Sequence, residues 1–258
     1  EVTTNYTTAL GSGVYGIYRQ AIATNITAGS PSVVYGTSLP TLTSTSNLVN
    51  GDSASLVLAG QVFSSSGNLA VGSYAVNVTS ASLATLSGLG YTVSGNSAGT
   101  LGVTPKTVTV SGIAASDKVY DGNTTAAVST AGAVLGGVNA GDVVSVSASG
   151  SFSDKNVGAG KTVNLTSTHG GADAGNYSFV DQGSTTASIT PKALTISGLK
   201  ANDKVYDGST ADTVNTSAAV YSGLVAGDAV TVSATGTFGD KNVGTGKVVT
   251  LCSTNGGA

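Results

Sequence analysis

The chain has 258 residues and a formal net charge of −3, and its composition excludes several classes of protein. Only 9% of the residues are charged, and the ten Lys and Arg are scattered, so the positive stripe that contacts nucleic-acid phosphates is missing. No apolar run approaches the roughly 18 residues that suffice to cross a bilayer. We therefore expect no nucleic-acid partner and no membrane span.

The remaining composition favours β-structure outside the cell. Apolar residues make up 40% of the chain, which is enough for packed cores, and Thr, Ser and Val dominate between 37 glycines. β-Branched side chains lose rotamer freedom in helices and fit a pleated surface, so the prediction is an all-β fold. Low Lys and abundant Thr, Ser and Asn indicate an extracellular or cell-surface location. The single cysteine, Cys252, excludes an internal disulfide framework, and we interpret it as a small strand residue, with an intermolecular disulfide as the alternative.

Residues 1–20 read like the end of a repeat whose beginning lies elsewhere. Asn5-Tyr6 resembles Asn176-Tyr177, and Tyr18-Arg19-Gln20 takes the place of Thr190-Pro191-Lys192. We expect this segment to supply the terminal strand or strands that complete a preceding repeat.

Residues 21–106 form the first complete repeat, a diverged copy of the later ones. Val34-Tyr35-Gly36 stands where the later copies have Val-Tyr-Asp-Gly, and Asn50-Gly51-Asp52 matches a later Gly-Asp landmark. Tyr91 lies 86 residues before Tyr177. Residues 80–87 are the one helical candidate, of one or two turns.

Residues 107–192 form the second repeat, and its motifs return in residues 193–258 after an ungapped interval of 86 residues. The segment 117–124, Asp-Lys-Val-Tyr-Asp-Gly-Asn-Thr, recurs from Asp203 with Ser209 in place of Asn123, and the segment 152–158 recurs from Phe238 with Gly239 in place of Ser153. Strands alternate Val or Ala with Ser, which places one face on a core and the other in solvent. The prediction is a series of small β-rich domains, grasp-like or sandwich, in an elongated array.

The third repeat ends early relative to the second. Gly256-Gly257-Ala258 matches Gly170-Gly171-Ala172, so residues 193–258 lack the last 20 or so residues of the repeat, which correspond to residues 1–20. We hypothesise that the chain is one unit of a head-to-tail array, in which the N-terminal strand completes the last repeat of the neighbouring copy. The linkage is either covalent, in a longer polypeptide, or a non-covalent strand donation.

The motifs Lys118-Val119-Tyr120-Asp121-Gly122 and Lys204-Val205-Tyr206-Asp207-Gly208 resemble those of the YDG repeat domain, as do the Asp-Lys-Asn-Val-Gly segments at 154–158 and 240–244. The unit with Val34-Tyr35-Gly36 is similar to the related MBG domain. The resemblance covers nearly the whole chain. It implies a stalk or shaft module of large exported bacterial adhesins, including the filamentous-haemagglutinin-like proteins of two-partner secretion, and it implies no ligand.

Two interpretations of the Tyr-Asp-Gly motif compete. In the first, the motif is a structural turn: Asp caps its own backbone, Gly adopts the left-handed conformation, and Tyr packs at a domain joint. Its residues are Tyr120, Asp121, Gly122, Tyr206, Asp207 and Gly208. The second is a calcium site, since hard cations take several oxygen ligands. Its candidate ligands are Asp117, Asp121, Asp142, Asp154, Asp203, Asp207, Asp228 and Asp240. No other cofactor is expected.

The chain carries further candidate sites, none of them catalytic. His169, the one histidine, is replaced by Asn255 in the next repeat, so we interpret it as a loop residue, and nothing supplies a nucleophile–base pair. Asn-x-Ser/Thr glycosylation sequons occur at Asn5, Asn25, Asn77, Asn123, Asn164, Asn176 and Asn215. The expected function is a non-enzymatic stalk or fibre module of a secreted or surface adhesin or matrix filament, with neighbouring copies of the repeat as partners. The alternative is a biofilm module that binds polysaccharide or a host or matrix surface.

Overall fold

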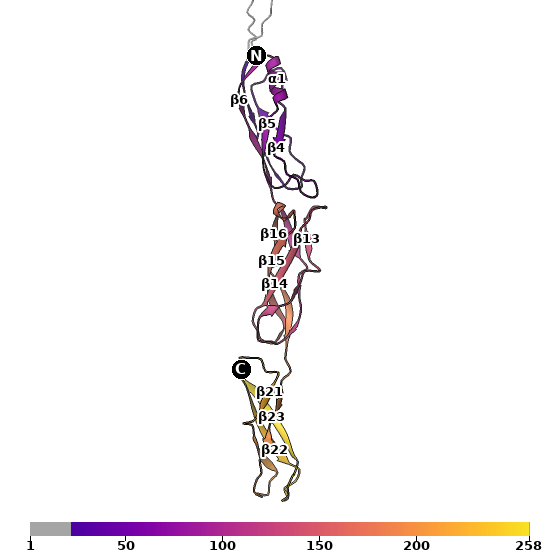
Figure 1. Ribbon diagram of the computed structural model, residues 1–258, viewed down its shortest axis with the longest axis vertical. Coiled ribbons are helices and arrows are strands. Elements are labelled where there is room, and N and C mark those ends of the chain that lie inside the picture. Colours follow the sequence, from indigo (N-terminus) through magenta and orange to yellow (C-terminus); the bar gives the residue numbers. More distant parts are fainter. Residues whose placement is uncertain (1–21, 258) are drawn as a thin grey trace, which may run out of the picture. The chain divides into compact units, whose positions relative to one another are not determined.

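The computed structural model of the chain describes residues 22–257, and strands dominate it throughout (Figure 1). The strands of the described residues form several small sheets of two to five strands each. The prediction of tandem all-β domains is confirmed. Within the described range, no helix is both long and apolar enough to cross a membrane.

The chain divides into two compact units that do not follow the sequence repeats. The first takes the described residues up to Gly112 together with Ala133–Ser147 and Ser167–Gln182. The second takes Ile113–Gly132, Ala148–Thr166 and the described residues from Gly183 onward. The middle repeat therefore contributes to both units, and each junction between consecutive repeats lies inside one unit.

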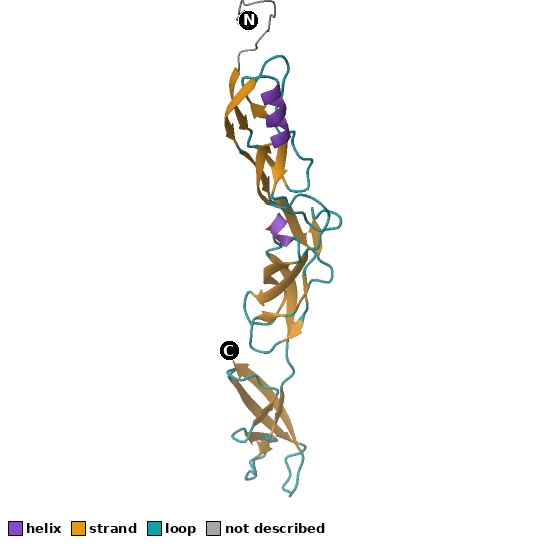
Figure 2. Cartoon of the chain, turned by 45° about the horizontal axis from the view of Figure 1, so that its top comes forward, coloured by secondary structure: helices purple, strands orange, loops and turns teal. Residues whose placement is uncertain are grey.

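The first repeat combines two sheets with one helix (Figures 1 and 2). One sheet has the order β3-β1-β6 and the other the order β2-β7-β5-β4. Their bounds are β1 Ile22–Ala28, β2 Ser32–Val34, β3 Ser44–Thr45, β4 Leu56–Ala59, β5 Gly72–Val78, β6 Tyr91–Ser97 and β7 Gly99–Thr104.

Helix α1, Ser80–Gly88, lies where the sequence favours a helical segment and is slightly longer than expected. The hydroxyl of Thr79 caps its first turn by accepting a hydrogen bond of 3.1 Å from the Ser82 amide. Leu86 is 1% exposed and joins a small core with Ile26, Val78 and Tyr91, so packing against the strands holds this short helix.

The second repeat has a complete set of strands. A five-stranded sheet has the order β10-β17-β15-β14-β11, and a three-stranded sheet has the order β13-β8-β16. Their bounds are β8 Lys106–Ser111, β9 Ala114–Ala115, β10 Lys118–Val119, β11 Thr125–Ala126, β12 Val128–Ser129, β13 Val134–Gly136, β14 Ser145–Phe152, β15 Gly158–Gly170, β16 Tyr177–Val180 and β17 Ser184–Thr190, with a 3₁₀ turn at Ala174–Asn176.

The described part of the third repeat repeats this arrangement with fewer strands. Its sheets have the orders β19-β20-β22-β23 and β18-β21. Their bounds are β18 Thr195–Ser197, β19 Lys200–Ala201, β20 Ala211–Asn215, β21 Val220–Ser222, β22 Val230–Phe238 and β23 Val249–Gly257. The described residues provide no counterpart of β16 or β17.

Packing differs accordingly between the repeats. One cluster of the first compact unit joins Tyr35, Tyr74 and Leu101 of the first repeat to Val108 and Tyr177 of the second. The second unit has its own cluster, Ala126, Phe152, Val163, Ala187 and Ile189. From residue 190 to residue 257, no apolar side chain is buried. The first junction therefore has a core, whereas the third repeat, as described, has none.

Candidate functional site at the repeat junctions

The Tyr-Gly and Tyr-Asp-Gly motifs form the same kind of turn in all three repeats. Gly36, Gly122 and Gly208 have φ angles of +77°, +80° and +77°, a region that side chains with a Cβ rarely adopt. In the second repeat, the Asp121 carboxylate accepts a hydrogen bond of 3.1 Å from the Asn123 amide and caps the turn. The turn fixes the tyrosine that precedes it.

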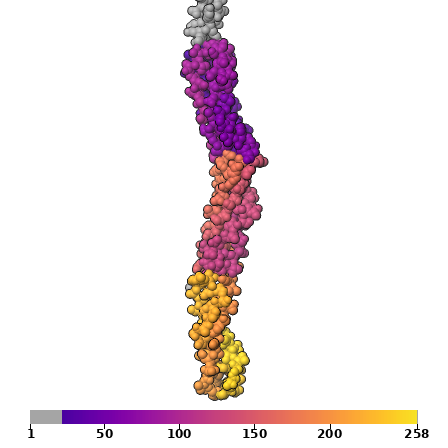
Figure 3. Space-filling model, viewed as in Figure 1, coloured from indigo at the N-terminus to yellow at the C-terminus, as the bar shows by residue number. Residues whose placement is uncertain are grey.

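At the first junction, this tyrosine reaches the Gly-Asp loop of the next repeat. In the space-filling view, atoms of the first repeat (indigo to purple) touch atoms of the second repeat (magenta to orange) (Figure 3). The Tyr35 hydroxyl donates to Oδ2 of Asp142 at 2.6 Å, and the Tyr177 hydroxyl donates to the same oxygen. The two tyrosine rings meet edge to face, with centroids 5.3 Å apart. Tyr35 is completely buried. Asp142 thus connects a tyrosine of its own repeat to a tyrosine of the preceding one.

The hydrogen bonds at this junction favour the ionised form of the Asp142 carboxyl. Burial raises the pKa of Asp142, but hydrogen bonds from Ser66, Tyr177 and Tyr35 outweigh it and hold the pKa at about 2. Burial and the hydrogen bond to Asp142 raise the pKa of Tyr177 well above its usual value. At neutral pH the Asp142 carboxyl is therefore ionised and the Tyr177 hydroxyl keeps the proton that it donates.

A second contact at the same junction uses the loop that precedes β5. The Asp173 carboxylate, in a residue that is 3% exposed, accepts from the Ser65 amide at 3.0 Å and from the Val143 amide at 2.8 Å. These backbone hydrogen bonds lower the pKa of Asp173. Oδ1 of Asn176 accepts from the Val71 amide at 2.8 Å. Side chains of the second repeat thereby satisfy loop amides of the first.

The glycine of the turn allows the two repeats to approach closely. A Cβ added at Gly36 would lie 2.1 Å from Nδ2 of Asn139. The side chain of Asn139 is held by Lys106, whose ammonium donates to Oδ1 of Asn139 at 2.6 Å. The backbone amide of Asn139 donates to the Tyr177 hydroxyl. A larger residue at position 36 would force the junction open.

The second junction repeats the tyrosine–aspartate contact and the close approach at the turn glycine, inside the second compact unit. The Tyr120 hydroxyl donates to Oδ1 of Asp228 at 2.9 Å, and this hydrogen bond raises the pKa of Tyr120. The Lys155 ammonium lies 3.9 Å from the same carboxylate oxygen. A Cβ added at Gly122 would lie 2.8 Å from Val225, which corresponds to Asn139. The tyrosine–aspartate contact is therefore a recurring element of this chain.

The third copy of the motif has no such partner among the described residues. Tyr206 is 60% exposed and Val205 is 88% exposed. A Cβ added at Gly208 would meet nothing within 4 Å. The third motif forms the same turn, but among the described residues no other repeat packs against Val205, Tyr206 and Gly208.

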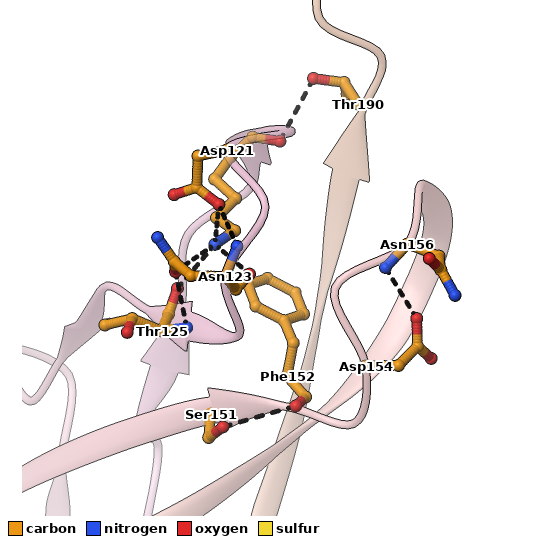
Figure 4. Close-up of polar contacts among 9 residues, drawn as sticks. Asp121, Asn123, Thr125, Ser151, Phe152, Asp154, Asn156 and Thr190 are labelled. Atoms are coloured by element: carbon orange, nitrogen blue, oxygen red, sulfur yellow. Dashed lines mark hydrogen bonds and ion pairs between the residues drawn. The ribbon is translucent and has the colours of Figure 1, made fainter. Parts of the chain in front are cut away.

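A lysine ammonium occupies the oxygen-rich loop beside each Tyr-Asp-Gly turn. In the second repeat, Lys118 donates to Asp121 at 2.7 Å, to both oxygens of Asn123 at 2.8 and 2.9 Å, and to the Thr125 carbonyl at 3.1 Å (Figure 4). It also lies 5.6 Å from the centroid of the Phe152 ring, within cation–π range. The side chain is 16% exposed. A built-in cation thus takes the oxygens that a metal ion would need.

Three further lysines of the motifs, Lys161, Lys204 and Lys247, pair with a neighbouring aspartate in a similar way. Lys204 donates to Asp207, to Ser209 and to the Ala211 carbonyl at 2.7–3.1 Å, and it holds the pKa of Asp207 at about 2. Lys161 donates to Asp154 at 2.6 Å and Lys247 donates to Asp240, and these contacts lower the pKa of both carboxyls.

The structure distributes the eight aspartates of the calcium interpretation among different roles. Asp121, Asp154, Asp207 and Asp240 pair with lysines, Asp142 and Asp228 accept from junction tyrosines, and Asp117 accepts from the Ser188 amide at 2.6 Å. Asp203 lines an open groove. Within residues 22–257, no three His, Cys, Asp or Glu side chains are grouped so that they could hold a metal ion.

The glycosylation sequons differ in accessibility. Asn25, Asn123, Asn164 and Asn215 are exposed, and Asn77 is half-buried. Asn176 is 8% exposed and its side chain is engaged by Val71, so the folded chain leaves no space for a glycan there. Asn5 lies outside the described residues, as does the whole segment 1–20 with its expected strands.

His169 and Cys252 lie apart from the junctions. Nε2 of His169 lies 2.8 Å from Asp181, and its ring stacks on Phe179 with centroids 3.8 Å apart. Cys252 is an exposed residue of β23, opposite Thr235 of β22.

Sequence reasoning named Asp142 and Asp228 as candidate calcium ligands and did not anticipate that they accept hydrogen bonds from Tyr35 and Tyr120. It did not single out Asp173, Asn176 or Asn139. The signal was available in part, since Gly51-Asp52, Gly141-Asp142 and Gly227-Asp228 recur in step with the Tyr motifs. That recurrence marks these residues as equivalent, but it does not say that the aspartate of one repeat meets the tyrosine of the repeat before it.

Comparison with known proteins agrees with the repeat pattern. Residues 104–187 and 190–258 each match the YDG domain, and residues 24–102 match the MBG domain of the YGX type. The comparison finds no match among curated proteins and none among solved structures. The YDG matches alone cover more than half of the chain. The chain therefore belongs to the YDG domain family, with an MBG domain of the YGX type ahead of its two YDG domains.

Proposed function

We propose that this chain is a non-enzymatic structural module, a stalk or fibre segment of a bacterial secreted or cell-surface adhesin or matrix filament. Its role is to hold consecutive repeats in a fixed relation, and the surfaces that it uses are the repeat junctions. The YDG and MBG domain types, which occur in adhesin-like extracellular proteins, support this role and location.

The observation that carries the proposal is the tyrosine–aspartate hydrogen bond that recurs at both junctions. Tyr35 with Asp142, and Tyr120 with Asp228, join repeats that follow one another in the chain. At the first junction the donor Tyr35 is completely buried. A charge-assisted hydrogen bond from such a donor contributes about 1.5–3 kcal/mol and is directional, so it resists bending at that junction. A module selected for binding a ligand would not need the same contact at every junction.

The proposal includes the head-to-tail arrangement of copies. Residues 1–20 match the end of the second repeat in sequence, and the described part of the third repeat lacks the corresponding strands. A neighbouring copy of the unit completes that repeat, whether the copies are linked covalently or by strand donation.

The second candidate function is a module that binds polysaccharide or a matrix surface. The hydroxyl-rich outer faces of the strands favour it, for example the exposed Ser147 and Thr168, whose hydroxyls lie 2.7 Å apart. The chain has no Trp and 5% aromatic residues, so a stacking platform for sugar rings is lacking. Retention on immobilised polysaccharide, with loss on adding the free sugar, would favour this candidate.

Junction rigidity tests the structural role directly. Spin labels at the exposed positions Ala75 and Thr109, in a chain carrying Cys252→Ser, report the distance between the first and second repeats. We expect a narrow distance distribution that broadens when Tyr35→Phe and Asp142→Asn are combined. The control, Tyr206→Phe, changes an exposed tyrosine and should leave the distribution narrow. A distribution that is broad in the unmodified chain would contradict the proposal.

A further inference from the structure

A lysine and an asparagine of the second repeat lie against each other at the start of β8. The Lys106 ammonium donates a hydrogen bond of 2.6 Å to Oδ1 of Asn139. The sheet register explains this contact, because β8 and β13 pair antiparallel with Thr109 opposite Gly136. Continuing that register along both chain segments places Lys106 opposite Asn139. The backbone of the sheet therefore holds the two side chains together.

The amide nitrogen of Asn139 has no partner. Its Nδ2 atom is buried and makes no hydrogen bond in the described structure. It lies over Gly36 of the first repeat, where an added Cβ would be 2.1 Å away. A buried donor that stays unpaired is costly, and native structures rarely keep one. The carboxamide at this position therefore needs an explanation other than packing.

The other two repeats have valine at the equivalent position. Val225 follows Asn139 by the repeat period of 86 residues. In the first repeat the equivalent residue is Val49, whose amide donates to the Tyr91 hydroxyl at 3.0 Å. The Asn139 amide donates to the Tyr177 hydroxyl in the same way. An apolar side chain thus satisfies the fold at this position, and the amide group of Asn139 is specific to the second repeat.

Lys106 differs from the lysines beside the turn motifs. Lys118, Lys161, Lys204 and Lys247 each form an ion pair with an aspartate. Within residues 22–257, no ion pair includes Lys106. Conversion of its ammonium to the free amine therefore breaks no ion pair. The free amine is the form of lysine that acts as a nucleophile.

The geometry brings this nucleophile to a carbonyl carbon. A C=O bond is about 1.23 Å long, so Cγ of Asn139 lies within about 3.8 Å of the Lys106 Nζ atom. Reacting atoms that are held at about 3–3.5 Å react as if at very high concentration. A small shift of either side chain brings the pair to that distance.

We propose that Lys106 and Asn139 form an isopeptide bond. The Nζ–Cγ bond forms, the Cγ–Nδ2 bond breaks, and Nδ2 leaves as ammonia. Of the three hydrogens of the ammonium, one stays on the new amide and two leave with Nδ2, so the by-product is an ammonium ion. Nothing is oxidised or reduced, and no co-reactant is needed. This inference goes beyond the proposed function and does not depend on it.

The bond has two structural consequences. It removes Nδ2 and with it the unpaired buried donor. It also joins the start of β8 to the Gly-Asp loop, whose Asp142 amide donates to the Asn139 carbonyl at 3.2 Å. β8 follows β7 of the first repeat after a single residue, so a pull on the chain between these repeats acts on β8. The bond transmits that pull to the loop that carries Asp142.

The mass of the intact chain tests the bond. We expect the purified chain, denatured and with Cys252 reduced, to be lighter than its sequence mass by one ammonia. Trypsin should not cleave after Lys106, because its side chain is no longer an amine. The digest should contain a branched peptide in which the segment with Lys106 is joined to the segment with Asn139.

Matched variants assign the two partners. Lys106→Arg keeps the positive charge but removes the amine, and Asn139→Val introduces the residue of the other repeats. Both variants should have their full sequence mass. The control Lys118→Arg changes a lysine whose Nζ lies 2.9 Å from Oδ1 of Asn123, and it should still lose one ammonia. A far-UV circular dichroism spectrum like that of the unmodified chain shows that each variant folds.

Three outcomes would overturn the proposal. The full sequence mass in the folded, unmodified chain would mean that no bond forms. A loss of ammonia without a branched peptide, mapped to Asn50 or Asn255, would be a succinimide at an Asn-Gly sequence. A branch between Lys118 and Asn123 would place the reaction in the oxygen-rich loop instead.

The mass and the junction distance report on different claims. A chain that has lost ammonia but shows a broad distance distribution at the first junction would overturn the structural role and leave the isopeptide bond in place. A narrow distribution in a chain of full sequence mass would overturn the bond and leave the structural role.

Discussion

The hydroxyl of Tyr35 lies 2.6 Å from the carboxylate of Asp142, a residue 107 positions later that belongs to the next repeat. Tyr120 makes the same contact with Asp228 at 2.9 Å, 108 positions later. These contacts turn the Tyr-Gly and Tyr-Asp-Gly motifs from local turns into links between repeats. The links explain why the tyrosine and the Gly-Asp loop recur together through the chain.

The Tyr35–Asp142 link should be measurable as a coupling energy. Tyr35→Phe removes a completely buried donor and leaves the half-buried Asp142 carboxylate with fewer partners, so we expect a loss of about 1–3 kcal/mol in the free energy of unfolding. The double-mutant cycle with Asp142→Asn, measured by urea denaturation, should give a coupling above about 0.5 kcal/mol. Tyr206→Phe, at the exposed third motif, should change stability by less than about 0.5 kcal/mol. Additive effects of Tyr35→Phe and Asp142→Asn would contradict the link.

Stability should fall in acid in a way that depends on Asp142. Its pKa is about 2 in the folded chain and about 3.9 in an unfolded one, so the unfolded state binds the proton more tightly. The stabilisation from this group is present above about pH 4 and is lost as the pH falls toward 2. Thermal unfolding followed by circular dichroism should show a steeper decline for the unmodified chain than for Asp142→Asn. Parallel curves would mean that Asp142 titrates normally.

Glycine-to-alanine changes should separate the turn from the junction. All three motif glycines have positive φ, so alanine costs about 1 kcal/mol at each for the backbone alone. At Gly36 and Gly122 the new Cβ would also meet Asn139 at 2.1 Å and Val225 at 2.8 Å. We expect larger losses there than at Gly208, where the space is open. Equal melting temperatures for the three variants would contradict this, because they would mean that the junctions accommodate the new Cβ with no loss of stability.

Lys118 should act as an internal cation. Lys118→Met removes an ammonium that satisfies four oxygens, so we expect a loss of about 2 kcal/mol in the free energy of unfolding. Lys192→Met, at an exposed position, is the matched control and should have little effect. Calcium added to the unmodified chain should leave its melting temperature unchanged in calorimetry, because Lys118 and Lys161 hold the carboxylates. A calcium-dependent rise would support the metal interpretation instead.

Much of the local structure could be predicted from the sequence. The alternation of Val and Ser around residues 144–149 predicts a strand, and β14 lies there. The segment 80–87 predicts a helix, and α1 spans Ser80–Gly88. These features depend on side chains a few residues apart, so a linear pattern records them.

The partners of the charged side chains could not be predicted in the same way. Asp142 and Asp121 both follow or precede a glycine in a polar loop, yet one accepts from two tyrosines and the other from a lysine. The 86-residue period shows that Asp142 and Asp228 are equivalent, but it says nothing about which surface each one faces.

The sequence by itself determined the β-rich class, the repeat period and the turn glycines. These features follow from the conformational preferences of individual residues and from internal repetition, which can both be read from the sequence. Only the tertiary structure decided that Asp142 accepts a hydrogen bond from the tyrosine of the preceding repeat and that lysines fill the oxygen-rich loops. These features depend on how segments about 100 residues apart pack together. Hydrogen bonding at that range is set by the packed geometry and not by the neighbouring residues.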